Sequence, residues 1–282
     1  MNNWVKFLIL FLISAVVYHQ SFKTALNNSK NNGAFIALIS ILSGIISIIL
    51  IPFFPLKFEI DIKKIILLII TCILYAIVNR LNTYVRKYID VSIFAILRLL
   101  SNVIMIFMGL IFFKEKFILN KFIGAILIIF SNLLVLYDGK KNNDKKIIII
   151  SIIANILFAL TLFLNVNLSK SFNIPTYVSI ILIIPGIFIC IFEKKGIKAL
   201  TKEMKEGSKK AILLASISSA LTLIFQLKAY SFGQVALVSS LCSLNVILNV
   251  LFAYFIHNEK NNLLRKIIAS IIVIISIFLI KM

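Results

Sequence analysis

The chain alternates between long runs of apolar residues and short polar connections that are mostly basic. A helix needs roughly 20 apolar residues to cross the hydrocarbon core of a bilayer. Ten runs meet that length, and they cover residues 4–22, 33–53, 65–84, 91–113, 119–137, 147–168, 175–192, 211–230, 235–256 and 263–280. The runs are continuous rather than alternating, which favours spanning helices over the strands of a closed barrel. The sequence therefore predicts an all-α integral membrane protein with ten transmembrane helices.

Composition supports a membrane protein and argues against a nucleic-acid partner. Hydrophobic residues make up 61% of the chain and charged residues only 14%, whereas soluble domains are about half apolar and a quarter charged. The net charge of +20 comes from connections, where lysines can face anionic lipid headgroups. No cluster of stacking aromatics accompanies these lysines, as nucleic-acid binding would require. The three cysteines lie inside apolar runs without metal-ligand spacing, so neither a metal nor another cofactor is expected.

A repeat divides the chain into two similar halves. Glu115 and Lys116 occupy a short turn between two apolar runs, and a shift of 144 positions places Glu259 and Lys260 in the same context. The repeat predicts a first five-helix unit over residues 1–137, a linker over residues 138–146 and a second five-helix unit over residues 147–282. Because each unit has an odd number of spans, the two units must be inverted relative to each other. Inverted repeats bind substrate near the middle of the membrane and expose the site to each side in turn.

The two turns carry a family resemblance. The segments FFKEKFILNKFIGAILII and IHNEKNNLLRKIIASIIV each place a glutamate before the last span of a half. With ten spans in two halves, the chain resembles the drug/metabolite transporter superfamily, in particular its EamA-type members and the related nucleotide-sugar transporters. The resemblance implies an exporter or exchanger of amino acids, metabolites, nucleotide sugars or drugs. It also implies a multi-pass protein of the cell membrane, with a small molecule and membrane lipid as partners, acting as a monomer or homodimer.

The orientation in the membrane stays open at this stage. Connections on the side of the first-to-second loop carry more lysine and arginine than those on the other side, and the positive-inside rule would place both termini outside. The family resemblance implies that both termini are cytoplasmic. The longest connection, residues 193–210, is basic and predicts an interfacial helix or loop.

All ten acidic residues fall in connections. Proton-coupled exporters of cations usually hold a carboxylate within a span, and the small multidrug-resistance relatives use one in their first span. The first span here offers only His19, near its end, which disfavours cation export by that mechanism. Glu115 and Glu259 are expected to be structural, accepting backbone N–H groups at the starts of the fifth and tenth spans.

Arg98 is the one charge well inside a span. It follows Val91 by seven residues, which is about 10 Å along a helix axis. Asn102 and Met105 lie on the same helix face. Two interpretations remain open. Arg98 either faces the substrate as a partner for a carboxylate or phosphate, or extends back to the interface near Asp90.

Further polar residues recur at helical spacing on spans three, eight and nine, and span six carries Asn155. Asn and Ser in spans often join helices, but stripes on several spans favour a shared hydrated cavity. The predicted substrate-binding residues are Arg98, Asn102, Tyr75, Asn79, Asn155, Gln226, Asn245 and Asn249. Pro185 and Gly186 predict either a broken helix in span seven or a packing kink. Spans five and ten have the fewest polar groups and are expected at the periphery.

These features favour a transporter over an enzyme. The sequence has no HExxH motif and no glycine-rich phosphate loop. We expect a secondary transporter of a small polar metabolite that is anionic or zwitterionic, such as an amino acid, an organic anion or a phosphate or nucleotide-sugar compound. A multidrug or cation exporter of the same superfamily remains an alternative, as does a channel or lipid scramblase.

Overall fold

The computed structural model describes residues 3–59, 61–113, 119–136, 145–194, 196–259 and 263–281. Helices build this part of the chain, and one isolated antiparallel bridge joins Phe58 to Phe172. In chain order the α-helices are α1 (Asn3–Asn27), α2 (Asn32–Ile49), α3 (Ile62–Tyr88), α4 (Val91–Leu97), α5 (Leu99–Phe112), α6 (Leu119–Leu136), α7 (Lys145–Leu168), α8 (Ile174–Phe192), α9 (Ile197–Glu206), α10 (Lys209–Phe232), α11 (Val235–Cys242), α12 (Asn245–His257) and α13 (Leu263–Lys281). Short 3-10 helices cover Ile51–Phe53 and Ser169–Ser171.

Eight stretches of the described chain are long and apolar enough to cross a membrane. Two of them combine a pair of helices, α4 with α5 and α11 with α12. Helices α6 and α13, of 18 and 19 residues, occupy the places of the predicted fifth and tenth spans. The chain is therefore an all-helical, multi-pass integral membrane protein.

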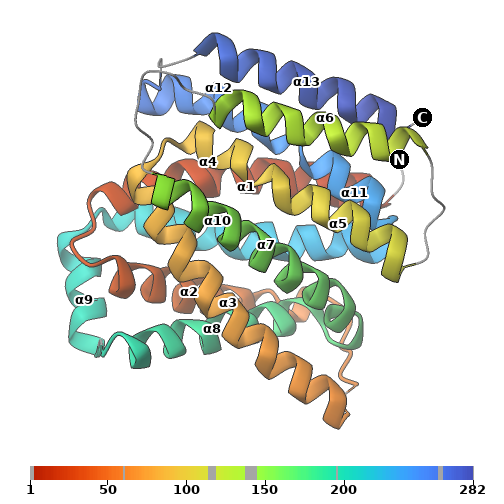
Figure 1. Cartoon of the computed structure of the whole chain (residues 1–282). Helices are drawn as coiled ribbons and strands as arrows, with labels where there is room; N and C mark the ends of the chain where they lie inside the picture. Colours follow the sequence, from red (N-terminus) through yellow and green to blue (C-terminus); the bar gives the residue numbers. More distant parts are fainter. Residues whose placement is uncertain are drawn as a thin grey trace.

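The packing pairs of the helices follow a regular scheme. Helix α1 packs on α10, and α3 packs on α7. Helix α2 packs on α8, while α6 packs on α13 at one edge of the molecule, as Figure 1 shows. The helices of spans four and nine also pack in pairs, α4 on α12 and α5 on α11. The edge position of α6 and α13 agrees with the scarcity of polar residues in their sequences.

Side-chain caps fix the starts of several helices. The Asn31 side chain accepts hydrogen bonds from the N–H groups of Gly33 and Ala34 at 3.1 Å each and so begins α2. Asp61 begins α3 by accepting the Lys64 N–H at 2.7 Å, and this bond holds the pKa of Asp61 below its usual value. Such caps satisfy the N–H groups that the first turn of a helix leaves unpaired.

Helix α8 runs unbroken through Pro185, so the sequence expectation of a broken seventh span is not met. The other expectation was a packing kink, and what the structure shows at this point is close packing at Gly186. A Cβ atom there would lie 2.7 Å from Ile41 Cγ1 and 3.2 Å from the Ala37 carbonyl oxygen on α2. Small residues allow membrane helices to approach closely, and Gly186 does so for α2 and α8.

The breaks occur instead in the fourth and ninth spans. Helix α4 ends and α5 begins at Arg98, where the Ser101 N–H bonds to the Arg98 carbonyl at 3.0 Å. Helix α11 gives way to α12 at Ser243 and Leu244, whose N–H groups bond three residues back at 3.0 and 3.1 Å. These 3-10 contacts interrupt both spans near their middle. Neither break contains proline or glycine, the residues that usually mark an interrupted helix in a sequence.

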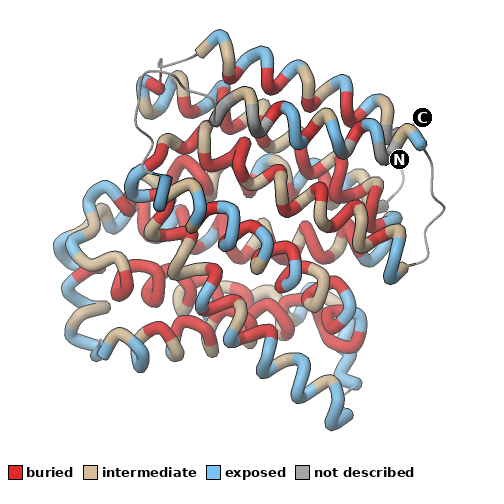
Figure 2. Tube along the Cα trace, in the orientation of Figure 1, coloured by how far each residue is buried: buried red, intermediate tan, exposed pale blue. Residues whose placement is uncertain are grey.

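The outer faces of the bundle are apolar. Figure 2 shows exposed residues along the outer sides of α13 and α6 and along the free end of α3. The exposed side chains include Ile65, Ile69 and Ile73 of α3 and Ile267 and Ile271 of α13. A soluble protein would bury such surfaces, whereas lipid tails cover them in a membrane. The basic connection over residues 193–210 was expected to form a helix or a loop, and it contains the helix α9.

Candidate functional site

A cavity of about 80 Å³ lies among α1, α3, α10 and the broken spans, with room for several water molecules. Six of the eight predicted substrate-binding residues line it, namely Arg98, Asn102, Tyr75, Asn79, Gln226 and Asn245. Four helices and the junction of α4 with α5 contribute these six. The lining side chains include neither aspartate nor glutamate. Among the described residues, no group of three His, Cys, Asp or Glu side chains is placed to hold a metal ion.

Arg98 sits at the junction of α4 and α5 with its guanidinium in the cavity. The guanidinium carbon lies 3.6 Å from the centre of the Phe158 ring and 6.0 Å from that of Phe94. A cation over an aromatic face is stabilised by the ring quadrupole. Asp90, the partner that an interfacial position would need, instead pairs with Lys266 at 3.6 Å. The geometry therefore places Arg98 at the cavity rather than beside Asp90.

Two further cavity residues were missed by the sequence analysis, Arg86 and His19. Arg86 Nη2 lies 3.0 Å from His19 Nδ1. An arginine can only donate, so Nδ1 accepts and the ring proton of His19 is on Nε2. Both side chains line the cavity, and Arg86 is only 5% exposed. The site thus holds two guanidinium groups where one was expected.

Both residues were missed because helices extend further than the apolar runs. Span three was expected to end at residue 84, which left Arg86 in a connection, but α3 continues to Tyr88. Likewise α1 continues to Asn27, so His19 lies two turns inside it. A signal was present, since Tyr75, Asn79 and Arg86 recur at intervals of four and seven residues on one face.

Asn155 and Asn249 lie outside the cavity lining. The Asn155 amide donates to the Ser151 carbonyl, one turn back on α7, at 2.8 Å. The Asn249 side-chain oxygen, Oδ1, accepts from the Gln20 side-chain amide at 3.1 Å and thereby joins α12 to α1. In both cases the side chain joins backbone or helices, which is the common role of asparagine in spans.

A hydrogen bond connects spans four and nine beside the cavity. Asn102 Nδ2 donates to the Ser243 hydroxyl at 3.0 Å. Asn102 lies one turn after the break in span four, and Ser243 lies at the break in span nine. The two interruptions are therefore linked to each other and to the cavity. Arg98 and Ser243 keep right-handed helical backbone angles, so each span is interrupted only by a short 3-10 contact.

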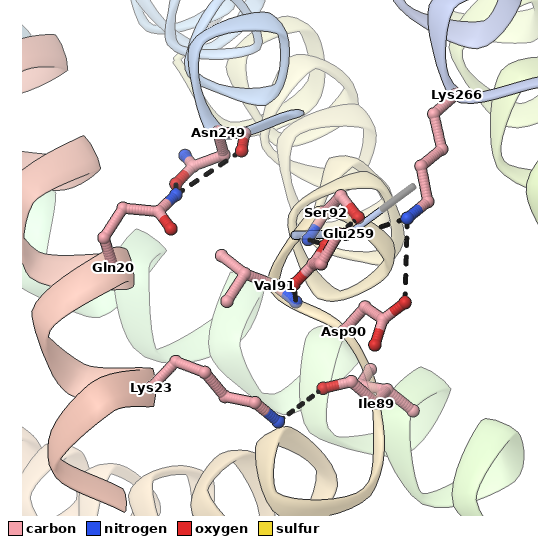
Figure 3. A network of polar contacts seen from close by, with 9 residues as sticks. All are labelled: Gln20, Lys23, Ile89, Asp90, Val91, Ser92, Asn249, Glu259 and Lys266. Carbon is pink, nitrogen blue, oxygen red and sulfur yellow. Dashed lines mark hydrogen bonds and ion pairs between the residues drawn. The ribbon is translucent and has the colours of Figure 1, made fainter. Parts of the chain in front are cut away.

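A network of charged groups lies beside the cavity (Figure 3). The Glu259 carboxylate accepts the Val91 N–H at 2.7 Å and the Ser92 N–H at 3.1 Å, and the Ser92 hydroxyl also donates to it. Lys266 Nζ lies 3.7 Å from Glu259 and 3.6 Å from Asp90. A small pocket of about 10 Å³, lined by Arg86 and Asp90, separates this network from the cavity.

The network corrects one expectation about the turn glutamates. Glu259 was expected to cap the tenth span, yet it caps the first turn of α4 in the fourth span. The reason is that α12 packs on α4. Glu259, which follows α12 by two residues, therefore reaches the first turn of α4. Its partner in the repeat, Glu115, lies outside the described residues.

The comparisons with known proteins agree with this architecture. Residues 2–137 and 145–282 each match the model of the EamA-like transporter family. A solved structure titled only as the crystal structure of a protein has a TM-score of 0.68 at 10% sequence identity, over 98% of this chain and 98% of that one. At this identity the likeness supports the fold alone. A comparison with curated proteins gives no match.

Proposed function

Since this chain belongs to the EamA-like transporter family, and is thus a membrane transporter, we propose that it moves a small anionic or zwitterionic metabolite. Amino acids, organic anions and phosphate compounds fall in this class. The mode we propose is exchange or facilitated diffusion by alternating access, in the cell membrane. The proposal further holds that the protein carries ten spans as two inverted units and performs no chemical reaction on its substrate.

The scheme of packing pairs supports the inverted arrangement. By position in the repeat, α1 corresponds to α7 and α3 corresponds to α10. Exchanging each helix for its counterpart turns the α1–α10 pair into the α7–α3 pair, and both pairs pack. The same exchange turns α4–α12 into α11–α5, and both of these pairs pack too. The start of span four thus lies beside the end of span nine, so the two spans run antiparallel. Antiparallel counterparts are what a two-fold axis in the membrane plane requires.

The observation that carries the substrate class is Arg98 in a cavity that no carboxylate lines. An anion entering the cavity meets a charge-assisted hydrogen-bond donor, and the neutral amides of Asn79, Asn102 and Gln226 can bind its polar remainder. A cation meets repulsion and no balancing charge. The cavity therefore favours anions and zwitterions over the cations of the multidrug alternative.

A thermal-shift panel of metabolites on the purified protein tests this proposal. Anionic or zwitterionic compounds should raise the melting temperature of the wild type, because a ligand that binds the native state stabilises it. Arg98→Ala should abolish the shift. Arg98→Lys should recover part of it, since the charge stays but the bidentate fork is lost.

Lys30→Ala is the matched control, because Lys30 is an exposed cation that pairs with Glu206 on the surface. It should leave the ligand-induced shift unchanged. Stabilisation by cationic compounds alone, equal in wild type and Arg98→Ala, would refute the proposal and favour the drug exporter.

A further inference from the structure

Arg86 is a buried cation with unused hydrogen-bonding capacity. Its guanidinium carbon lies 5.1, 4.6 and 4.2 Å from the ring centres of Tyr18, Phe22 and Phe94. Nη2 donates to His19, whereas Nε and Nη1 are buried and have no hydrogen-bond partner among the described residues. A buried donor without a partner is destabilising, and more so when it carries a charge. The side chain lines the cavity, where a ligand could satisfy these donors.

The charges around Arg86 leave it unmatched. Asp90 lines the small adjoining pocket, but it pairs with Lys266, as does Glu259. Lys23 lies on the same side, with its ammonium bound to the carbonyl oxygens of Arg86 and Ile89. These two lysines and two carboxylates balance in number. The positive charges of Arg86 and Arg98 therefore remain without a carboxylate in the cavity lining.

The two guanidinium groups line the same cavity and lie beside the same aromatic ring. Each lies near the same Phe94 ring, at 4.2 Å for Arg86 and 6.0 Å for Arg98. The Nε2–H of His19 and the amide of Asn102 belong to the same lining. The cavity thus presents two separated cations with neutral hydrogen-bonding groups around them.

We propose that Arg86 and Arg98 together select a doubly charged organic anion, a dicarboxylate or a phosphate monoester, over a singly charged one. This inference rests on the proposed transport of anions and names the class within it. A dianion neutralises both cations, whereas a monoanion leaves one of them buried and unpaired. The loss of one charge-assisted contact of 1.5–3 kcal/mol corresponds to a preference of roughly ten- to a hundredfold.

The test compares matched anions for binding to the full-length protein by isothermal titration calorimetry at about pH 8, where a phosphate monoester is fully charged. One pair is succinate against succinamate, and the other is monomethyl against dimethyl phosphate. In at least one pair, the wild type should bind the dianion ten times or more tightly than the monoanion. The pair that shows the preference distinguishes a dicarboxylate from a phosphate ester.

Arg86→Gln should remove this preference while monoanion binding persists, and Arg86→Lys should keep most of it. Lys30→Gln is the surface control and should match the wild type. Equal affinities within both pairs in the wild type overturn the inference, a result that needs no variant to fold. A dianion preference that survives in folded Arg86→Gln overturns it too.

Failure of this inference and failure of the proposed function give different results. If Arg98→Ala abolishes anion binding but Arg86→Gln changes neither affinity, the transporter still takes anions and only the two-cation site is refuted. If neither anion pair binds and cationic compounds stabilise the protein, both are refuted.

Discussion

At the scale of single residues, this protein places charge inside a membrane and balances most of it locally. Lys266 is 2% exposed and lies between two carboxylates, and Arg80 pairs with Glu193. Arg86 and Arg98 are held by aromatic rings instead, which offer a weaker and non-neutralising contact. Lys266 and Arg80 are thus neutralised by carboxylates within the protein, whereas the charges of Arg86 and Arg98 are available to a ligand.

Glu259→Gln should therefore lower stability more than ligand affinity. The amide keeps the shape but removes the charge that the N–H groups of Val91 and Ser92 and the ammonium of Lys266 contact. A hydrogen bond to a charged group contributes about 1.5–3 kcal/mol, so we expect a loss of roughly 2 kcal/mol. The melting temperature of the purified protein measures it.

Two variants sharpen this test. Glu206→Gln removes an exposed carboxylate from surface ion pairs and should change little. Adding Lys266→Met to Glu259→Gln should restore part of the stability, because the buried ammonium then no longer needs a partner. Normal stability with lost ligand binding in Glu259→Gln would make this carboxylate part of a gate.

At the scale of elements, close packing of α2 on α8 depends on two glycines. A Cβ atom at Gly44 would lie 2.4 Å from Ile183 Cγ1 and 3.1 Å from the Ser179 carbonyl oxygen. Gly44→Ala should cost about 1–3 kcal/mol, as overpacking does, and lower the melting temperature. Gly196→Ala is the matched control, since nothing lies within 4 Å of its added Cβ. Equal melting temperatures for the two variants would show that the α2–α8 interface accommodates the added methyl group without loss of stability.

The elements also show what the sequence could and could not predict. Apolar runs predicted the helices, since a run of bilayer length has few alternatives. The apolar runs did not predict where a helix continues past its run, as α3 does at Arg86. A polar residue at the end of a helix cannot be told from one in a loop by a single sequence. The breaks at Arg98 and Ser243 were also missed. Serine side chains bond back to the backbone at both places, Ser101 to the Arg98 carbonyl and Ser243 to the Ser239 carbonyl, and serine is too common in spans to mark a break by itself.

The candidate site was predictable in part for the same reason. Periodicity placed Arg98, Asn102, Tyr75 and Asn79 on single faces of their helices, and those faces meet at one cavity. Asn155, a lone polar residue in its span, was expected at the same cavity but bonds to its own helix. Spacing along one helix reveals a face, whereas the neighbour that the face meets depends on the packing of the whole bundle.

At the scale of the whole molecule, the exchange symmetry of the helix pairs bears on mechanism. Two antiparallel broken spans meet at the cavity, and the Glu259 network lies beside it, next to the pocket lined by Arg86 and Asp90. If the two units exchange conformations, the cavity becomes closed on one side of the membrane and open on the other. A carrier of this type exposes its site to one side at a time, and each turnover moves a bound ligand.

Liposome transport separates this carrier from a channel or lipid scramblase. Liposomes containing the wild-type protein and an unlabelled anion that stabilises it should take up labelled anion faster than empty liposomes do. The initial rate should saturate with concentration, because one cavity of limited size returns after each turnover. Arg98→Ala should lower the rate strongly, while Lys30→Ala should not. Flux that rises linearly with concentration, a steady voltage-driven current, or lipid flipping without anion counterflow would show that the cavity belongs to an open pathway and that alternating access is wrong.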